Sequence, residues 1–218
     1  PVGGSGRPHP ILARFAMTWV KICGLTRSED VAAAVAAGAD AVGFVAAASS
    51  PRFVSPEEAA ALGRNAAAVR ILVTVDLEPE DLLGAARRAG VDGVQPHGRH
   101  AAAAATAAAA AGMLVLQPVA VLPGRRPSLD GAVAGAIPLL DTHHPAAHGG
   151  TGRAFDWSLA RGLARRFVLA GGLDPENVRR AVSAAAPWGV DASSRLETAP
   201  GIKDPGRVEA FIAAAKDS

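Results

Sequence analysis

The sequence of 218 residues has little of several features that would assign it to other classes of protein. It contains a single cysteine, so no disulfide can form within the chain. Half of its residues are apolar, yet no apolar run approaches the roughly 20 residues that a membrane helix needs. The first residues lack the apolar core and cleavage site of a secretory signal. These absences lead us to expect a cytoplasmic globular protein that does not enter a membrane.

The chain also lacks a strong charge of either sign. Its 22 Lys and Arg residues stand against 20 Asp and Glu residues, and the cations are scattered rather than gathered in a stripe. This distribution argues against a nucleic-acid partner, whereas a small anionic substrate suffices to explain the slight excess of positive charge. His143, His144 and His148 match no standard zinc spacing and have no cysteine or acidic ligand in the motif. We therefore expect no metal.

The first residues differ in composition from the rest of the chain. Residues 1–16 are rich in Gly, Pro and Arg and precede Met17, which is a possible natural start. We expect them to be a flexible tail or upstream sequence that carries no chemistry. Residues 17–218 contain no linker of Pro, Gly and Ser and are long enough for one sizeable core, so we expect them to form one domain.

Short β-type runs alternate with Ala-rich helical stretches along this domain. The predicted strands are Val20–Cys23, Ala41–Val45, Ile71–Val75, Gly93–Gln95, Met113–Val119, Ile137–Leu140, Phe167–Ala170 and Gly189–Ala192. The predicted helices cover residues 28–37, 56–68, 79–89, 99–111, 128–134, 156–164, 175–186 and 205–216. Helix signals support these bounds, with candidate N-caps at Ser28, Ser55, Asp156 and Asp174 and helix-ending glycines at Gly38, Gly90 and Gly112.

A weak internal repeat points to the same architecture. Residues 38–42, 90–94 and 189–192 all read as the end of a helix, a turn and the start of a strand. Their spacing corresponds to whole numbers of βα units of roughly 25 residues. The pattern predicts an α/β protein with a single (β/α)8 TIM barrel. An open doubly wound sheet is the alternative, although it would more often have fewer strands and a Gly-rich loop after the first.

In such a barrel the catalytic residues lie at the carboxyl ends of the strands and in the loops that follow them. The residues expected there are polar or small: Cys23, Arg52, Asp76, His97, Gln117, Asp141, Gly171, Gly172, Ser193 and Ser194. Gly171 and Gly172 close an apolar strand and allow backbone N–H groups to approach an anion such as phosphate. The segment Gly149–Gly152 is a weaker signal, because it reads equally as a flexible loop or as a cover over a phosphate site.

Two of these residues suggest acid/base chemistry. Cys23 ends the run Val20–Cys23, and a thiolate there could take a proton from carbon if positive charge lies near it. Asp141 directly follows four apolar residues, where desolvation raises a carboxyl pKa and would let it act as a general acid. Arg52, stiffened by Pro51, reads either as a surface residue or as a fork that grips a substrate carboxylate.

The sequence resembles the phosphoribosylanthranilate isomerase family of tryptophan biosynthesis over nearly all of the chain from Met17 onward. The resemblance rests on segments in the order of the family, namely Val20–Thr26, Gly38–Val45, Ser50–Ser55, Leu139–Thr142, Gly149–Gly152, Phe155–Trp157, Ala170–Leu173, Pro175–Val178 and Pro200–Asp204.

This resemblance implies a cofactor-free Amadori rearrangement of N-(5-phosphoribosyl)anthranilate, a small phosphorylated aromatic substrate. By position, Asp141 would protonate the ribose ring oxygen, Cys23 would remove the C2′ proton and Arg52 would hold the anthranilate carboxylate. The remaining substrate-binding residues, chiefly for phosphate, would be His97, Gly150, Thr151, Gly171, Gly172, Asp191, Ser193, Ser194 and Arg195. A monomer and a homodimer are both compatible with the sequence.

Departures from the family pattern fall on the expected catalytic rim. Arg195 stands where a glycine is usual after the last strand, and its side chain could block the phosphate site or add a guanidinium to it. Pro96 replaces a leucine before His97, and proline could bend the end of that strand. Two alternatives therefore stay open: an isomerase of another phosphoribosyl-amine in secondary metabolism, and a non-catalytic barrel that binds a phosphorylated metabolite.

Overall fold

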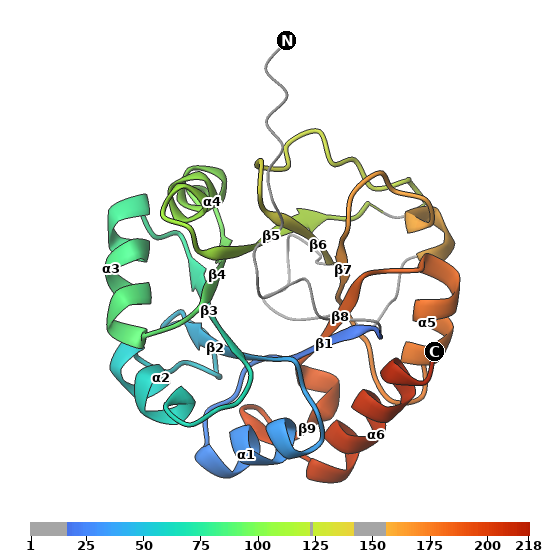
Figure 1. Cartoon of the computed structure of the whole chain (residues 1–218), viewed down its shortest axis with the longest axis horizontal. Helices are drawn as coiled ribbons and strands as arrows, with labels where there is room; N and C mark the ends of the chain where they lie inside the picture. The colour runs from blue at the N-terminus through green and yellow to red at the C-terminus, as the bar shows by residue number, and fades with distance from the viewer. Residues whose placement is uncertain (1–16, 123, 142–155) are drawn as a thin grey trace.

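The computed structural model describes residues 17–122, 124–141 and 156–218. Eight parallel strands follow one another around a closed barrel, and the last strand pairs with the first. Figure 1 shows this ring of strands with helices outside it. The strands are β1 (Trp19–Ile22), β2 (Ala41–Ala46), β3 (Val69–Val75), β4 (Gly93–His97), β5 (Leu114–Ala120), β6 (Ile137–Asp141), β7 (Val168–Leu169) and β8 (Gly189–Ala192). The predicted (β/α)8 barrel is confirmed.

Six α-helices cover the outside of the barrel in the described residues. They are α1 (Ser28–Ala36), α2 (Pro56–Gly63), α3 (Pro79–Ala89), α4 (Ala101–Ala110), α5 (Val178–Ala185) and α6 (Pro205–Lys216). The predicted cap of α2 is confirmed, because Ser55 and Glu58 each bind the backbone N–H of the other. The predicted cap at Ser28 is wrong, since Arg27 precedes α1 and Ser28 is its first residue.

The prediction of a helix over residues 128–134 is wrong. Side chains from other segments bind the backbone there and leave it irregular (Figure 1). Gln117 on β5 accepts from the N–H of Val133 at 2.7 Å and donates to the carbonyl of Gly131 at 3.0 Å. Arg165 donates to the carbonyls of Ala132 and Val133 in the segment and to that of Ala136 just after it. Tertiary hydrogen bonds therefore replace helical ones.

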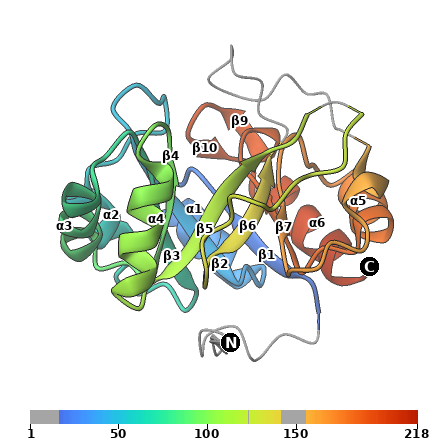
Figure 2. The same cartoon turned by 90° about the horizontal axis from the view of Figure 1, so that it is seen from above.

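Other predicted boundaries shift. The helix over 156–164 shortens to a 3-10 turn, Trp157–Ala160, that Asp156 caps as predicted. The helix over 175–186 begins only at Val178, because Asp174 and Asn177 form a turn in front of it, so Asp174 is not its N-cap. The chain after β8 also holds a 3-10 turn, Ser194–Leu196, and a hairpin of β9 (Glu197–Ala199) and β10 (Ile202–Lys203) that were not predicted. Figure 2 shows the hairpin at one end of the barrel.

The barrel interior divides into two layers along the strands. Where the strands begin, the lower layer is apolar and includes Trp19, Ile71, Leu114, Leu116 and Ile137. Where they end, the upper layer is rich in polar side chains, which include Lys21, Cys23, Gln95, His97, Asp141 and Asp191. Alternation along each strand carries residues of both kinds into the same interior. β1 thus supplies Trp19 below and Lys21 above.

Glycine makes room for the largest residue of the lower layer. A Cβ atom at Gly189 would lie 2.8 Å from the carbonyl oxygen of Trp19 and 2.9 Å from its ring. The indole of Trp19 therefore packs against bare backbone, and it stacks on Trp188 with ring centroids 5.0 Å apart.

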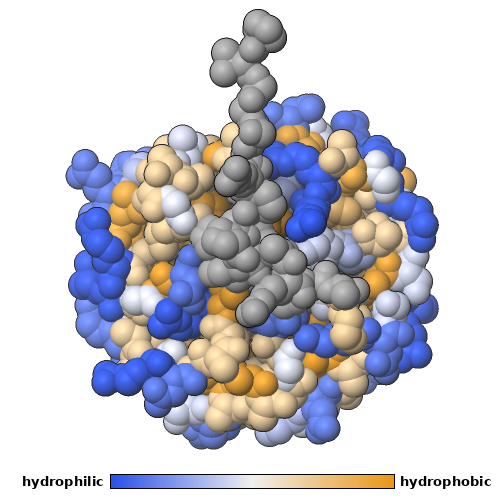
Figure 3. Space-filling model, in the orientation of Figure 1, coloured by the Kyte–Doolittle hydropathy of each residue, from blue (hydrophilic) through white to orange (hydrophobic). Residues whose placement is uncertain are grey.

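The outer surface is mixed. Figure 3 shows hydrophilic residues spread around the visible face, with apolar residues between them. Among the described residues, no helix is long and apolar enough to cross a membrane.

Candidate active site

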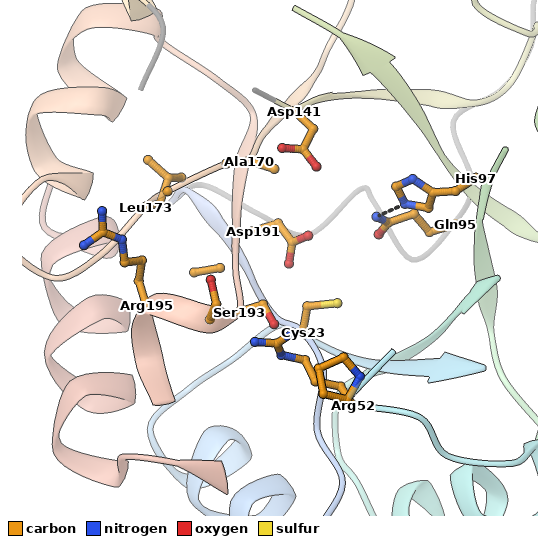
Figure 4. A pocket seen from close by; sticks show the side chains of 15 residues that line it. Cys23, Arg52, Gln95, His97, Asp141, Ala170, Leu173, Asp191, Ser193 and Arg195 are labelled. Atoms are coloured by element: carbon orange, nitrogen blue, oxygen red, sulfur yellow. Dashed lines mark hydrogen bonds between the residues drawn. The ribbon is translucent and has the colours of Figure 1, made fainter. Parts of the chain in front are cut away.

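A cavity of about 490 Å³ opens at the carboxyl ends of the strands. Its walls come from the ends of β1, β4, β6, β7 and β8 and from the loop between β2 and α2 (Figure 4). The lining residues are Cys23, Pro51, Arg52, Gln95, His97, Asp141, Ala170, Gly171, Gly172, Leu173, Asp191, Ala192, Ser193, Ser194 and Arg195. The described residues to which the resemblance gave a catalytic or binding role are all in this list.

Two expected residues, Asp76 and Gln117, lie away from the cavity, and other predicted features cannot be placed. Gly150 and Thr151 fall outside the described residues, as do the three histidines of residues 143–148. Asp76 does not line the cavity; its carboxylate accepts from the backbone N–H of Arg99 at 2.7 Å. Gln117 holds the irregular segment after β5 instead. In the described part of the chain, no group of three or more His, Cys, Asp or Glu side chains could hold a metal ion.

A network of buried polar side chains crosses the upper layer beneath the cavity. The ammonium of Lys21 donates to Asp191 at 2.9 Å and to Gln95 at 3.0 Å, so it joins β1 to β8 and β4. Gln95 in turn bonds to the ring of His97 at 3.0 Å, as Figure 4 shows. Lys21 and Gln95 were not predicted as site residues. The signal was present, because strand alternation places Lys21 on the same face as Cys23.

The ionisable groups of this network and the neighbouring Cys23 shift one another's pKa values. Burial lowers the pKa of Lys21, but the charges of Asp191 and Cys23 more than offset this and raise it above its ordinary value, so the ammonium stays charged. Burial raises the pKa of the Cys23 thiol, and Lys21 opposes that rise. Burial also raises the pKa of Asp191, again against Lys21. Cys23 thus has the neighbouring positive charge that a thiolate needs, in a site that otherwise disfavours ionisation.

A second charged network holds Arg52. Its Nε and Nη2 atoms donate to the two carboxylate oxygens of Glu197 at 2.8 and 2.7 Å, and Lys203 donates to the same carboxylate at 2.7 Å. Burial alone would raise the pKa of Glu197, but the two cations bring it below its ordinary value. A Cβ atom at Gly24 would lie 2.5 Å from Cδ of Arg52, so this approach requires glycine.

This network changes how Arg52 could bind an anion. The guanidinium fork that we expected to grip a substrate carboxylate is taken by Glu197. Within the described residues, the third nitrogen, Nη1, has no hydrogen-bond acceptor, and Arg52 lines the cavity. Glu197 and Lys203 lie on β9 and β10, a hairpin that the sequence patterns did not predict, and were missed for that reason.

Two further groups define the cavity. Among the described residues, the Oδ1 atom of Asp191 is buried without a hydrogen-bond partner, while Oδ2 accepts from Lys21. Figure 4 shows the exposed side chain of Arg195 pointing away from Cys23 and Asp191, and its charge acts on Asp174 in the loop after β7. Arg195 therefore does not fill the space in front of Cys23.

Comparison with known proteins identifies the family to which this site belongs. The family model described as N-(5′-phosphoribosyl)anthranilate (PRA) isomerase matches residues 20–214. The chain belongs to this family. It is 42% identical over 209 residues to the PRA isomerase of Geobacter sp. (strain M21), covering 92% of this chain and 98% of the relative. The PRA isomerase of Rubrobacter xylanophilus is 40% identical, with 92% of this chain and 100% of that protein covered.

Solved structures of PRA isomerases share the fold. The crystal structure of the enzyme from Thermotoga maritima matches with a TM-score of 0.82 at 39% identity and covers 93% of this chain and 100% of that chain. Another PRA isomerase structure, in complex with reduced 1-(o-carboxyphenylamino)-1-deoxyribulose 5-phosphate, matches with a TM-score of 0.78 at 36% identity and covers 93% of this chain and 100% of that chain. That bound compound is a phosphorylated aromatic molecule.

Proposed function

We propose that this chain converts N-(5-phosphoribosyl)anthranilate into 1-(2-carboxyphenylamino)-1-deoxyribulose 5-phosphate, with Asp141 as general acid and Cys23 as general base. The observation that carries the proposal is that both side chains line one cavity, from β6 and from the end of β1, together with the glycines after β7. This arrangement supports acid/base chemistry on a phosphorylated substrate in the tryptophan pathway.

The reaction needs one proton delivered and one removed. Asp141 donates its proton to the ribose ring oxygen, the C1′–O bond breaks and the anthranilate nitrogen lone pair forms an open-chain iminium ion. Cys23 as thiolate then takes the C2′ proton, and the electrons of that C–H bond neutralise the iminium as an enolamine. Tautomerisation of the enolamine gives the ketone. Asp141 ends the first two steps as carboxylate and Cys23 as thiol, so the pair holds one proton before the first step and again after the second.

Binding groups surround this pair. We assign the phosphate to the backbone of Gly171, Gly172, Ser193 and Ser194, because both glycines have positive φ (86° and 68°) and all four residues line the cavity. The Nη1 edge of Arg52 is assigned to the anthranilate carboxylate. His97 stands at the rim with them, and Gly150 and Thr151 stay predictions for the phosphate side.

Asp191 fits a sugar hydroxyl. Its Oδ1 atom is a buried acceptor with no partner among the described residues, and leaving such an acceptor unpaired costs free energy. A ribose hydroxyl that donates to Oδ1 would satisfy it. The direction of Arg195, toward the loop after β7, favours a guanidinium that adds to the phosphate grip over one that blocks it.

The experiment is a fluorescence assay that follows the loss of N-(5-phosphoribosyl)anthranilate with the purified protein. We expect turnover that depends on Cys23 and Asp141. Matched assays with a phosphoribosyl-amine lacking the anthranilate carboxylate separate this function from an isomerase of other substrates, which would favour the second compound. Binding of product without turnover of either compound would indicate a non-catalytic barrel.

We further propose a cytoplasmic enzyme that is monomeric or homodimeric; sedimentation of the purified chain distinguishes these two states.

A further inference from the structure

We infer that Lys21 is a positioning residue for the reaction, holding the sulfur of Cys23 in place and supplying the charge that balances its thiolate. This inference rests on the proposed function for the role of Cys23 as base. It does not depend on which phosphoribosyl-amine is bound.

The first support is the place of Lys21 in the barrel. Its side chain is fully buried, and two of its three ammonium hydrogens are directed to Asp191 and Gln95 at 2.9 and 3.0 Å. The charge of Lys21 also acts on Cys23, which lies two residues further along the chain, directly after the end of β1. Partners on β4 and β8 therefore hold the ammonium group in place beside Cys23.

The second support is the close packing of the two side chains. A Cβ atom at Gly43 would lie 2.9 Å from Sγ of Cys23 and 3.0 Å from Cε of Lys21. Sulfur and ammonium stem thus rest on the same bare backbone of β2, which fixes where the sulfur stands. Glycine at position 43 is needed for this contact rather than for its backbone conformation, because its φ is not positive.

The third support is the charge count around the sulfur. The groups of the described chain that face Cys23 are Lys21 on β1, Arg52 before α2, Asp191 on β8 and Lys203 on β10, with Glu197 of β9 bound to the last cation. Asp141 and His97 line the rest of the cavity. Lys21, Arg52 and Lys203 carry three positive charges against the two carboxylates of Asp191 and Glu197. One thiolate at Cys23 neutralises the excess.

Electrostatics gives the direction of the effect. Burial is the largest influence on the Cys23 thiol and raises its pKa, and the ammonium of Lys21 is the largest influence that lowers it. Removing that ammonium should therefore raise the pKa of Cys23 further and reduce the population of thiolate. A lysine whose charge was fully neutralised by Asp191 would instead leave the titration of the thiol unchanged.

The test uses the fact that Cys23 is the single cysteine of the chain. The ultraviolet absorbance of the thiolate then reports this residue alone. In Lys21→Met we expect the titration midpoint of the thiol to rise by about one pH unit or more, the usual scale for loss of an adjacent opposite charge. We also expect kcat to fall by about threefold or more, since the greater basicity of the remaining thiolate offsets part of its lower population.

Two further variants complete the test. Lys216→Met removes a lysine that pairs with Asp40 at the opposite end of the barrel, and it should leave the thiol titration unchanged. If Lys21→Met fails to fold because Asp191 is left unpaired, the double variant Lys21→Met/Asp191→Asn removes both charges. The midpoint should still rise in it, because Lys21 affects Cys23 more than Asp191 does.

The outcomes distinguish this inference from the proposed function. An unchanged thiol midpoint in a folded variant without Lys21 would overturn the inference, even if the unmodified chain isomerises N-(5-phosphoribosyl)anthranilate. A raised midpoint in a chain that fails to isomerise that compound would support the inference about Lys21 and contradict the proposed substrate.

Discussion

The lower and upper layers of the barrel interior are built by the same strands and do different work. β1 places Trp19 below and Lys21 above, and β8 places Gly189 below and Asp191 above. In the lower layer buried apolar side chains fill the space. In the upper layer, buried Lys21, Gln95 and Asp191 bond to one another beneath an open cavity. Two positions that are only two residues apart on one strand therefore differ in role, because the first packs the core and the second belongs to the polar network under the cavity.

This difference shows where the molecule accepts a cost for function. Apolar burial in the lower layer stabilises the fold at about 25 cal/mol per Å² of apolar surface. Burial of charged groups in the upper layer costs free energy that pairing only partly returns. Ion pairs also occur where the strands begin, as between Arg70 and Asp92, but those side chains are each 29% exposed, against 0% and 8% for Lys21 and Asp191. Substitutions in the two layers should therefore affect different measurements.

The largest expected effect is on turnover, from the two reacting groups of the upper layer. Cys23→Ala and Asp141→Asn should each lower kcat by at least about 100-fold, the scale for loss of a positioned acid or base. Both should unfold in denaturant near the midpoint of the unmodified chain. Turnover close to that of the unmodified chain in either variant would show that the proton passes through another group.

The second effect belongs to the lower layer and should appear in stability. Leu116→Ala opens a cavity at a fully buried position on β5 and should lower the free energy of unfolding by about 2–5 kcal/mol. Urea unfolding followed by circular dichroism measures this change. Activity per folded molecule should stay near that of the unmodified chain; a large loss of kcat there would mean that the two layers are not separable.

A smaller effect, on KM, should distinguish two bidentate ion pairs that lie at opposite ends of the barrel. Lysine cannot make the paired hydrogen bonds that Arg52 makes to Glu197. Arg52→Lys should raise KM for N-(5-phosphoribosyl)anthranilate by about tenfold, the value of one charge-assisted hydrogen bond, with less change in kcat. Its control is Arg70→Lys, at the pair with Asp92, which should leave KM unchanged. Equal effects of the two variants would contradict a binding role for Arg52.

The smallest effect is expected at the exposed edge of the cavity. Arg195→Gly should raise KM by no more than about fivefold, because exposed charge pairs contribute about 0.2–1 kcal/mol, and added salt should reduce the difference. Unfolding should change little. Arg99→Gly removes another exposed cation that lies outside the cavity lining and serves as control. A lower KM in Arg195→Gly would indicate that Arg195 blocks phosphate.

The sequence predicted the barrel because its signals were local. The alternation of short β-type runs with helical stretches predicted the strands, and caps such as Ser55 with Glu58 predicted where helices begin. The missing helix over 128–134 shows the limit, because the side chains of Gln117 and Arg165 determine that backbone from other parts of the chain. Pro96 fits β4 without ending it, opposite Thr74 in the neighbouring strand, and the strand continues to His97.

The candidate site was predicted in part for the same reason. Cys23, Asp141 and Arg52 stand at the ends of strands or in the loops after them and could be found by position, whereas the partners of Arg52 could not. Glu197 lies 145 residues from Arg52 in the chain and reaches it only because the hairpin after β8 folds back. Contacts across a closed barrel of this kind, such as that of Lys21 with Gln95, depend on which strands face each other and are absent from any local pattern.

The central claim is that Cys23 and Asp141 act as a pair that holds one proton. The most direct measurement is the pH dependence of kcat/KM, compared with the absorbance titration of the Cys23 thiol in the same protein. The two groups share one proton, and the pair works when that proton is on Asp141 and Cys23 is thiolate. Once the thiol form has ionised, no proton is left for Asp141 to donate, and burial raises the pKa of that thiol. Activity should therefore persist beyond about pH 8.5, the ordinary pKa of cysteine, and then fall with the midpoint of the thiol titration. A profile that stays level while the thiol titrates, or that falls well before it does, would contradict the account.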